Sequence, residues 1–228
     1  MADPRRTVPQ AGTLPLFAEP AAEPGRVERL GPGAFVLHGA ALPRVPRLLS
    51  ALDGVVAEAP FRHWVMPGGL AMSVAMTNCG ALGWVSDRRG YRYCAEDPLS
   101  GKPWPAMPAA FAELARKTAE AAGYPHFVPD ACLVNRYVPG ARLTPHQDKD
   151  EASFDAPIVS VSLGAPATFL FGGHARSDKA ARVPLVHGDV VVWGGPDRLR
   201  YHGVQRLEPA EHPLLGATRI NLTFRKAG

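Results

Sequence analysis

Apolar and polar positions follow two different periods along the chain, and the change falls near Gly123. Before that point, apolar residues recur at helical spacing in residues 42–59 and 108–122. The second segment has Pro108 in its first turn and Gly123 directly after its apolar stripe, where helices commonly begin and end. The pattern therefore predicts two helices in the first half of the chain.

After Gly123, apolar residues alternate with polar ones, as they do in half-buried strands. The alternating runs are residues 131–138, 158–164, 167–171, 189–193 and 219–225. Turn signals rich in Gly and Pro separate them. Residues 70–77 predict one further strand, between the two helices. Short strands at this spacing predict a mainly β architecture of the sandwich or jelly-roll type.

Two stretches show neither period. Residues 1–25 contain a Pro every few positions and few large apolar groups, which predicts a flexible arm. Residues 78–108 form a long aperiodic stretch that is rich in aromatics. Aperiodic stretches of this length inside a domain usually carry function.

Composition narrows the class of protein. The content of 23 Gly and 24 Pro among 228 residues disfavours coiled coils and helical bundles, and we expect one domain over residues 26–228. The net charge of +4 permits an anionic partner. No apolar run is long enough to span a membrane, and the N-terminus lacks the apolar core of a secretory signal. Three cysteines without paired spacing fit a reducing cytoplasm.

One short motif has the spacing of a metal site. His146 and Asp148 are two residues apart in an extended segment, so their side chains project to the same side. A later His would complete the two-His, one-carboxylate set that binds non-haem Fe(II) and leaves coordination positions open. We select His202, which lies between this motif and the last strand. His187 and Asp189 repeat the spacing, and we assign them to a turn.

The last predicted strand has one apolar and one polar face. Its polar face carries Arg219, Asn221, Thr223 and Arg225. A guanidinium matches a carboxylate bidentately. The two arginines are about 20 Å apart along the strand, so they could hold the two ends of a short dicarboxylate only if their side chains lean together. The alternative is an edge strand with a solvated side.

The aperiodic stretch interleaves aromatics with cations. Trp84 and Tyr91 lie beside Arg88, Arg89 and Arg92. This composition suits a base that is extruded from a stack and held by its face, with its flanking phosphates neutralised. The alternative is that both aromatics belong to the core beneath a loop.

Motifs from about residue 60 to the C-terminus together resemble one family. In order they include MSVAMTNCG, LGWVSDRRGY, KPWPAMP, PDACLVNRY, HQDKDE, HGDVVVWGG, YHG and RINLTFR. The chain resembles the bacterial AlkB family of iron(II)- and 2-oxoglutarate-dependent dioxygenases, which repair alkylated nucleic acid. This resemblance implies an α+β, mainly β fold. Its parts would be a double-stranded β-helix (jelly roll) core over about residues 130–228, flanking N-terminal helices, and a nucleotide-recognition lid over about residues 62–105.

The resemblance also implies a role for each matching residue. The Fe(II) ligands would be His146, Asp148 and His202. The contacts to 2-oxoglutarate would come from Asn135, Tyr137, Arg219, Asn221, Thr223 and Arg225. Of these, Arg219 would pair with the distal carboxylate and Arg225 would approach the metal-bound end. The contacts to the substrate would come from Trp84, Tyr91, Tyr93, Asp150 and Arg176. We expect Asp150 to face the reaction centre and the neighbouring Glu151 to lie in a solvated turn.

The expected activity is oxidative demethylation of bases of the 1-methyladenine and 3-methylcytosine type. It would consume 2-oxoglutarate and O2 and release formaldehyde, succinate and CO2. The expected partner is alkylated DNA, with single strands favoured, and also RNA; the expected state is a monomer in the cytoplasm. Two alternatives stay open at this point. The same chemistry could act on a protein or small molecule, or the jelly roll could be a binding module without catalysis.

Overall fold

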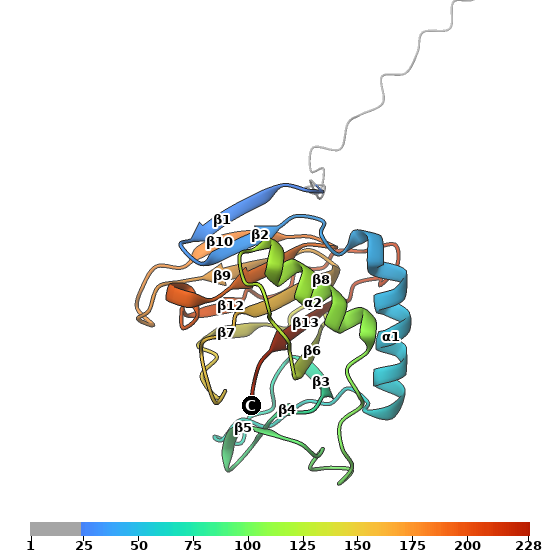
Figure 1. Ribbon diagram of the computed structural model, residues 1–228. Coiled ribbons are helices and arrows are strands. Elements are labelled where there is room, and N and C mark those ends of the chain that lie inside the picture. Colours follow the sequence, from blue (N-terminus) through green and yellow to red (C-terminus); the bar gives the residue numbers. More distant parts are fainter. Residues whose placement is uncertain (1–23) are drawn as a thin grey trace, which may run out of the picture.

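The computed structural model describes residues 24–228, in which two antiparallel sheets pack face to face (Figure 1). Within these residues, the large sheet has seven strands. In spatial order they are β1 (Val27–Gly31), β2 (Ala34–Leu37), β11 (Val190–Trp193), β8 (Ile158–Gly164), β13 (Arg219–Arg225), β6 (Ala131–Tyr137) and β3 (Ala75–Gly80). The small sheet comprises β10 (Ala181–Leu185), β9 (Ala167–Phe171), β12 (His202–Val204) and β7 (Leu143–His146). This arrangement is the predicted jelly roll.

Two helices cover the outer face of the large sheet (Figure 1). They are α1 (Val45–Glu58), which follows the short η1 turn (Leu42–Arg44), and α2 (Ala109–Ala121). Both predicted helices are confirmed, and Gly123 adopts φ 87° just beyond α2, as a helix stop does. Pro108 is the N-cap of α2 and not its first helical residue as predicted, because its ψ of 141° is extended.

Strand β13 lies in the middle of the large sheet, between β8 and β6. Its apolar side chains, including Phe224, pack against the helices, and Phe224 meets Phe111 of α2 edge to face. Its polar side chains are therefore directed toward the interior between the sheets. All seven of its residues are buried. The alternative of an edge strand with a solvated side is wrong.

A separate hairpin lies at the end of the fold near β3 (Figure 1). It consists of β4 (Gly83–Asp87) and β5 (Gly90–Cys94), and Arg88 and Arg89 form its turn. It occupies the stretch that the sequence indicated as aperiodic, because its polar and aromatic residues hide the strand period. We call it the lid hairpin.

Other elements differ in detail from the sequence pattern. The strand predicted over residues 70–77 is shifted to β3, and β1, β2, β7, β10 and β12 were not predicted. The arm predicted over residues 1–25 lies almost entirely outside the described residues. Within residues 24–228, no helix combines the length and the apolar character needed to cross a membrane.

Candidate active site

Two imidazoles face each other on the small sheet. His146 ends β7, His202 begins β12, and the two residues are directly paired in the antiparallel register. Their ring centroids lie 4.5 Å apart. The His202 ring also lies 4.9 Å from the ring of Trp193, which belongs to the large sheet. Both histidines therefore point into the space between the sheets.

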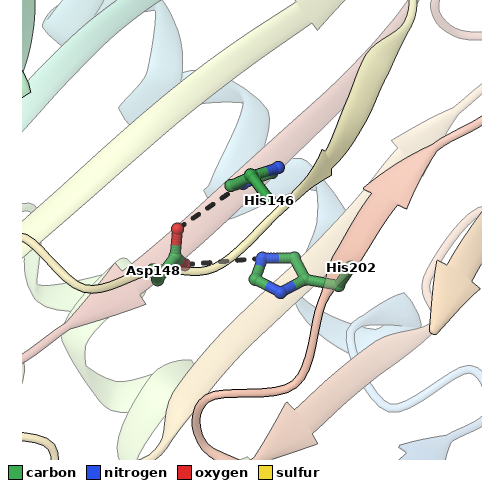
Figure 2. A group of neighbouring side chains, drawn as sticks. All are labelled: His146, Asp148 and His202. Atoms are coloured by element: carbon green, nitrogen blue, oxygen red, sulfur yellow. Dashed lines mark ion pairs between the residues drawn. The ribbon is translucent and has the colours of Figure 1, made fainter. Parts of the chain in front are cut away.

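Asp148 completes the group two residues after β7 (Figure 2). Its Oδ1 lies 3.5 Å from His146 Nε2 and its Oδ2 lies 3.6 Å from His202 Nε2. Ligand atoms of the three residues all lie within 4.8 Å of one another, and residues 24–228 hold no second group of this kind. The predicted convergence of His146, Asp148 and His202 is confirmed. His187 and Asp189 serve turns, as predicted, because each accepts backbone N–H groups.

Backbone carbonyls fix the ring nitrogen that each histidine presents. His146 Nδ1 lies 2.9 Å from Thr144 O, and His202 Nδ1 lies 3.0 Å from Arg200 O. Since a carbonyl only accepts, each Nδ1 carries the proton and donates it, which leaves the Nε2 lone pair for a metal. Burial and the neighbouring His146 lower the pKa of His202, so its ring stays neutral as a ligand must.

Asp148 is held as a carboxylate by a cation behind it. Its Oδ2 accepts from Arg225 Nε at 2.9 Å and from Arg225 Nη2 at 2.6 Å. Burial alone would raise the pKa of Asp148, but Arg225 and His202 hold that pKa well below its usual range. Two imidazoles and one carboxylate that converge on one point are the donor set that suits Fe(II) with open positions. The residues present fit that metal.

Arg219 is a buried cation without an anion. Its Nη2 donates to Ser162 Oγ at 3.0 Å, while its Nε and Nη1 have no hydrogen-bond partner. The guanidinium lies 5.0 Å from the ring of Tyr137, and burial lowers the pKa of Arg219. Since a buried unpaired charge is costly, these two donors indicate a binding site for an anionic ligand. A carboxylate of 2-oxoglutarate matches that fork.

Polar side chains from neighbouring strands of the large sheet lie near Arg219. Asn221 lies opposite Asn135 of β6 in the register, and its Nδ2 donates to Ser160 Oγ of β8 at 2.7 Å. Thr223 Oγ1 donates to Asn221 Oδ1 at 2.7 Å. Asn135 Oδ1 is buried without a partner. The sequence prediction that these polar residues share one face is confirmed, and their contact with a cosubstrate stays a prediction.

Trp84, Tyr91 and Tyr93 share one face of the lid hairpin. Trp84 lies directly opposite Tyr93 in the register, and Tyr91 is two residues before Tyr93 on β5. Trp84 and Tyr91 stack with centroids 5.5 Å apart and planes 16° apart. The alternative that both aromatics belong to the core is wrong for Tyr91, which is 45% exposed, whereas Trp84 is half-buried and packs against the core cluster that contains Val85. Trp84 Nε1 donates to Asp150 Oδ2 at 2.9 Å. The stacked pair therefore lies against the segment that carries Asp148.

Two arginines near the expected substrate site are bound to other groups of the protein: Arg92 to a carboxylate and Arg176 to a backbone carbonyl. Arg92 binds Asp87 through two hydrogen bonds, of 3.1 and 2.8 Å, and the hydrogen bond from Arg92 lowers the pKa of Asp87. Arg176 Nη2 donates to Pro145 O at 2.9 Å. Arg176 thus supports the backbone just before His146 as well as lying at the surface.

Two residues near the metal group differ from the sequence interpretation. Glu151 is buried, with 7% of its surface exposed, and does not lie in a solvated turn, whereas Asp150 is exposed. The reason is that Arg198 and Arg225 from distant segments surround Glu151. Arg198 was missed altogether. Its Nη1 donates to the backbone O of Asp148 at 2.9 Å, and only its place shortly before His202 in the chain could have drawn attention to it.

Arg225 contacts the metal group through Asp148. Its approach to the metal-bound end of 2-oxoglutarate, which the resemblance implied, stays a prediction. In the structure its Nε and Nη2 are both engaged by Asp148, and its Nε lies 3.3 Å from Glu151 Oε1. Arg225 therefore acts on the metal group through a protein carboxylate.

Comparison with known proteins covers all of this site. A family model described as the 2OG-Fe(II) oxygenase superfamily matches residues 33–225. The chain is 58% identical over 214 residues to a Salmonella typhimurium protein named alpha-ketoglutarate-dependent dioxygenase AlkB, over 94% of this chain and 98% of that protein. It is 56% identical over 215 residues to the Escherichia coli protein of the same name, with the same coverage of 94% and 98%.

A solved structure, that of OsALKBH1, is similar in fold. It superposes with a TM-score of 0.78 at 30% sequence identity, over 88% of this chain and 100% of that chain. The sequence and structural matches therefore agree, and both extend over the sheets that carry the metal group.

Proposed function

Since the chain belongs to the 2OG-Fe(II) oxygenase superfamily and, within it, to the AlkB dioxygenases, we propose that it demethylates alkylated bases in nucleic acid. The bases are of the 1-methyladenine and 3-methylcytosine type, in DNA and in RNA. The observation that carries the proposal is the stacked Trp84–Tyr91 pair beside the His146–Asp148–His202 group.

The reaction balances with the cosubstrates of the family. O2 and 2-oxoglutarate are consumed, one oxygen atom enters succinate as CO2 leaves, and the other enters the C–H bond of the methyl group. Bound Fe(II) supplies this oxidising chemistry, which no amino-acid side chain provides. The hydroxymethyl group then loses its proton and breaks from the ring nitrogen, so that formaldehyde leaves and the repaired base remains.

The chain contributes binding and orientation. His146, Asp148 and His202 would hold Fe(II), and Arg219 would bind the distal carboxylate of 2-oxoglutarate with its two unpartnered donors. Tyr137 packs beside that guanidinium. Fixing both reactants in this way converts a multimolecular reaction into a reaction within one complex.

The lid hairpin would hold the methylated base. Trp84 and Tyr91 present aromatic faces for stacking, and Asp150 beside them can accept from the exocyclic amine of adenine or cytosine. A carboxylate at this place also favours a base that methylation has made cationic. Arg88 and Arg89 at the hairpin turn suit flanking phosphates. Since an extruded base is easier to obtain from a single strand, single-stranded substrates are favoured.

The cysteines of the chain support a location in a reducing compartment. The three cysteines of the chain, Cys79, Cys94 and Cys132, are free thiols, which is typical of proteins that work in a reducing compartment. The enzyme acts in the cytoplasm as a monomer.

A single substitution at the metal group tests the proposal. We expect His146→Ala to bind a methylated oligonucleotide with the affinity of the metal-free wild type and to release no formaldehyde from it. His174→Ala, in an exposed loop, is the matched control and should keep both properties. Formaldehyde release by His146→Ala at the wild-type rate would contradict the metal assignment.

A further inference from the structure

Next to the metal group lies a buried carboxylate that the proposed chemistry does not use. Glu151 exposes 7% of its surface, and its Oε1 accepts from the hydroxyl of Tyr93 at 3.0 Å. The same oxygen lies 3.3 Å from Arg225 Nε. Its Oε2 lies 3.2 Å from Arg198 Nη2 without making a hydrogen bond. Glu151 is therefore the point at which the lid hairpin, β13 and the segment before β12 meet.

One guanidinium is shared between Glu151 and the metal group. Arg225 Nε donates to Asp148 Oδ2 at 2.9 Å and also lies 3.3 Å from Glu151 Oε1. The two carboxylates therefore compete for Arg225. When Arg225 leans toward Glu151, less of its positive charge acts on Asp148, and Asp148 becomes a stronger ligand for a cation.

A second guanidinium fixes the backbone while this competition takes place. Arg198 donates from Nη1 to Asp148 O at 2.9 Å and from Nε to Ala156 O at 3.1 Å. These contacts do not depend on the charge of Glu151. Loss of that charge should therefore change the electrostatics of the turn more than its shape.

Tyr93 connects Glu151 to the face that would bind nucleic acid. It lies opposite Trp84 in the lid hairpin, on the face that also carries Tyr91. Burial raises the pKa of Tyr93 well above its usual value, so the phenol keeps its proton and donates it to Glu151. A base seated against this face would press on Tyr93 and alter that hydrogen bond.

Building on the proposed function, we propose that Glu151 is a positioning residue that links the lid hairpin to the metal ligand Asp148 through Arg225. Nucleic acid at the lid draws the Tyr93 hydroxyl away from Glu151. Glu151 then attracts Arg225, and Asp148 is released toward the metal. Metal binding and nucleic-acid binding strengthen each other by the same factor, because such linkage is reciprocal.

The test measures metal affinity and needs no turnover. Mn²⁺ binding is followed by electron paramagnetic resonance on the full chain, without and with an oligonucleotide that carries 1-methyladenine. We expect the oligonucleotide to tighten Mn²⁺ binding by about fivefold or more in the wild type. In Tyr93→Phe we expect affinity without the oligonucleotide to rise toward that tighter value, with no further change when the oligonucleotide is added.

Glu151→Gln keeps the shape of the side chain and removes its charge. We expect Mn²⁺ to bind about 10- to 100-fold more weakly in this variant, with or without the oligonucleotide. Tyr124→Phe and Glu113→Gln are matched controls away from the site and should behave as the wild type. Tyr124 is a half-buried tyrosine that bonds Gly33 O, and Glu113 lies on the surface of α2.

Three results would overturn the inference: a wild type whose Mn²⁺ affinity ignores the oligonucleotide, a Tyr93→Phe variant with wild-type dependence on it, or a Glu151→Gln variant with wild-type affinity. Failure of the proposed function would be seen separately, as absence of formaldehyde from the wild-type enzyme. If the wild type demethylates and any of these three results is found, the link between the lid hairpin and Asp148 is refuted while the proposed function stands.

Discussion

At the scale of single residues, buried polar groups without hydrogen-bond partners define the expected cosubstrate site. Arg219 is buried with two unused donors, and Asn135 Oδ1 beside it is also unpartnered. Such groups are rare in folded proteins because each costs free energy when it is left without a partner. Asn135 faces Asn221, which is two residues from Arg219 on β13, so both unpartnered groups belong to one polar stretch of the sheet and indicate one polar ligand.

The donor fork of Arg219 leads to a prediction. Arg219→Lys should weaken 2-oxoglutarate binding by about 10- to 100-fold, since a lysine cannot donate two parallel hydrogen bonds to a carboxylate. Titration calorimetry of 2-oxoglutarate into Mn²⁺-loaded protein measures the effect. Arg182→Lys, on the exposed face of β10, is the control and should bind as the wild type. Equal affinity in the two variants would refute the role of Arg219.

A histidine outside the site should make folding stability depend on pH. His187 stacks on His212 with centroids 4.2 Å apart, and its Nδ1 accepts from Gly164 N at 2.9 Å. Burial and the neighbouring His212 lower the pKa of His187. The folded state thus resists protonation, so this contribution to stability is complete above the unfolded pKa of about 6.5 and is lost as the pH falls through the folded pKa.

The substitution His187→Gln tests whether stability falls on acidification because of His187. The glutamine amide oxygen can accept from Gly164 N and does not titrate. Urea unfolding at about pH 7.5 and about pH 5.5 gives the free energy of unfolding at each pH. We expect His187→Gln to lose less stability on acidification than the wild type. The exposed-loop variant His174→Gln serves as the control. A loss in His187→Gln equal to that of the wild type would show that His187 does not titrate as the structure indicates.

At the scale of elements, the lid hairpin and the small sheet carry the two halves of the chemistry. The hairpin supplies stacked aromatics, and β7 and β12 supply the paired histidines. The segment from Asp148 to Glu151 joins them, because Asp150 contacts Trp84 and Glu151 contacts Tyr93. Metal ligation and contact with the lid hairpin thus lie within one segment of four residues.

Substitutions in the lid hairpin can distinguish a nucleic-acid substrate from a protein or small-molecule substrate. The double substitution Trp84→Ala and Tyr91→Ala should abolish activity on methylated oligonucleotides, because each base–aromatic stack contributes about 1–3 kcal/mol. It should leave 2-oxoglutarate binding intact, since neither side chain contacts the metal group. Formaldehyde release and calorimetry measure the two properties. Unchanged turnover in this variant would favour a protein or small-molecule substrate.

Sequence reasoning found the strands with a clear apolar pattern and missed those without one. β8, β9 and β13 match the predicted ranges because their apolar residues make the pattern visible, whereas β10 is as long as β9 and was missed because exposed residues and Pro184 interrupt its pattern. β12 has three residues and β7 has four, one of them Pro145, so neither shows a period. The histidines were found from their chemistry and order in the chain, not from the strands that hold them.

At the scale of the whole molecule, packing of the two sheets assembles residues that are distant in sequence. Glu151 contacts both Tyr93 and Arg225, although these three residues lie in three distant segments of the chain. No local pattern reports such a contact, which is why Glu151 was interpreted as solvated and Arg198 was missed. The net charge of +4 is small, so affinity for nucleic acid should depend on the lid and a few arginines rather than on the general field of the protein.

The most direct test of the central claim is formaldehyde release by the wild-type enzyme. Matched DNA and RNA oligonucleotides that carry 1-methyladenine or 3-methylcytosine are incubated with Fe(II), 2-oxoglutarate and O2, and unmethylated strands serve as controls. We expect formaldehyde together with succinate from the methylated strands, and no formaldehyde from the controls. Folded, Fe(II)-loaded protein that releases no formaldehyde from any methylated strand would contradict the account.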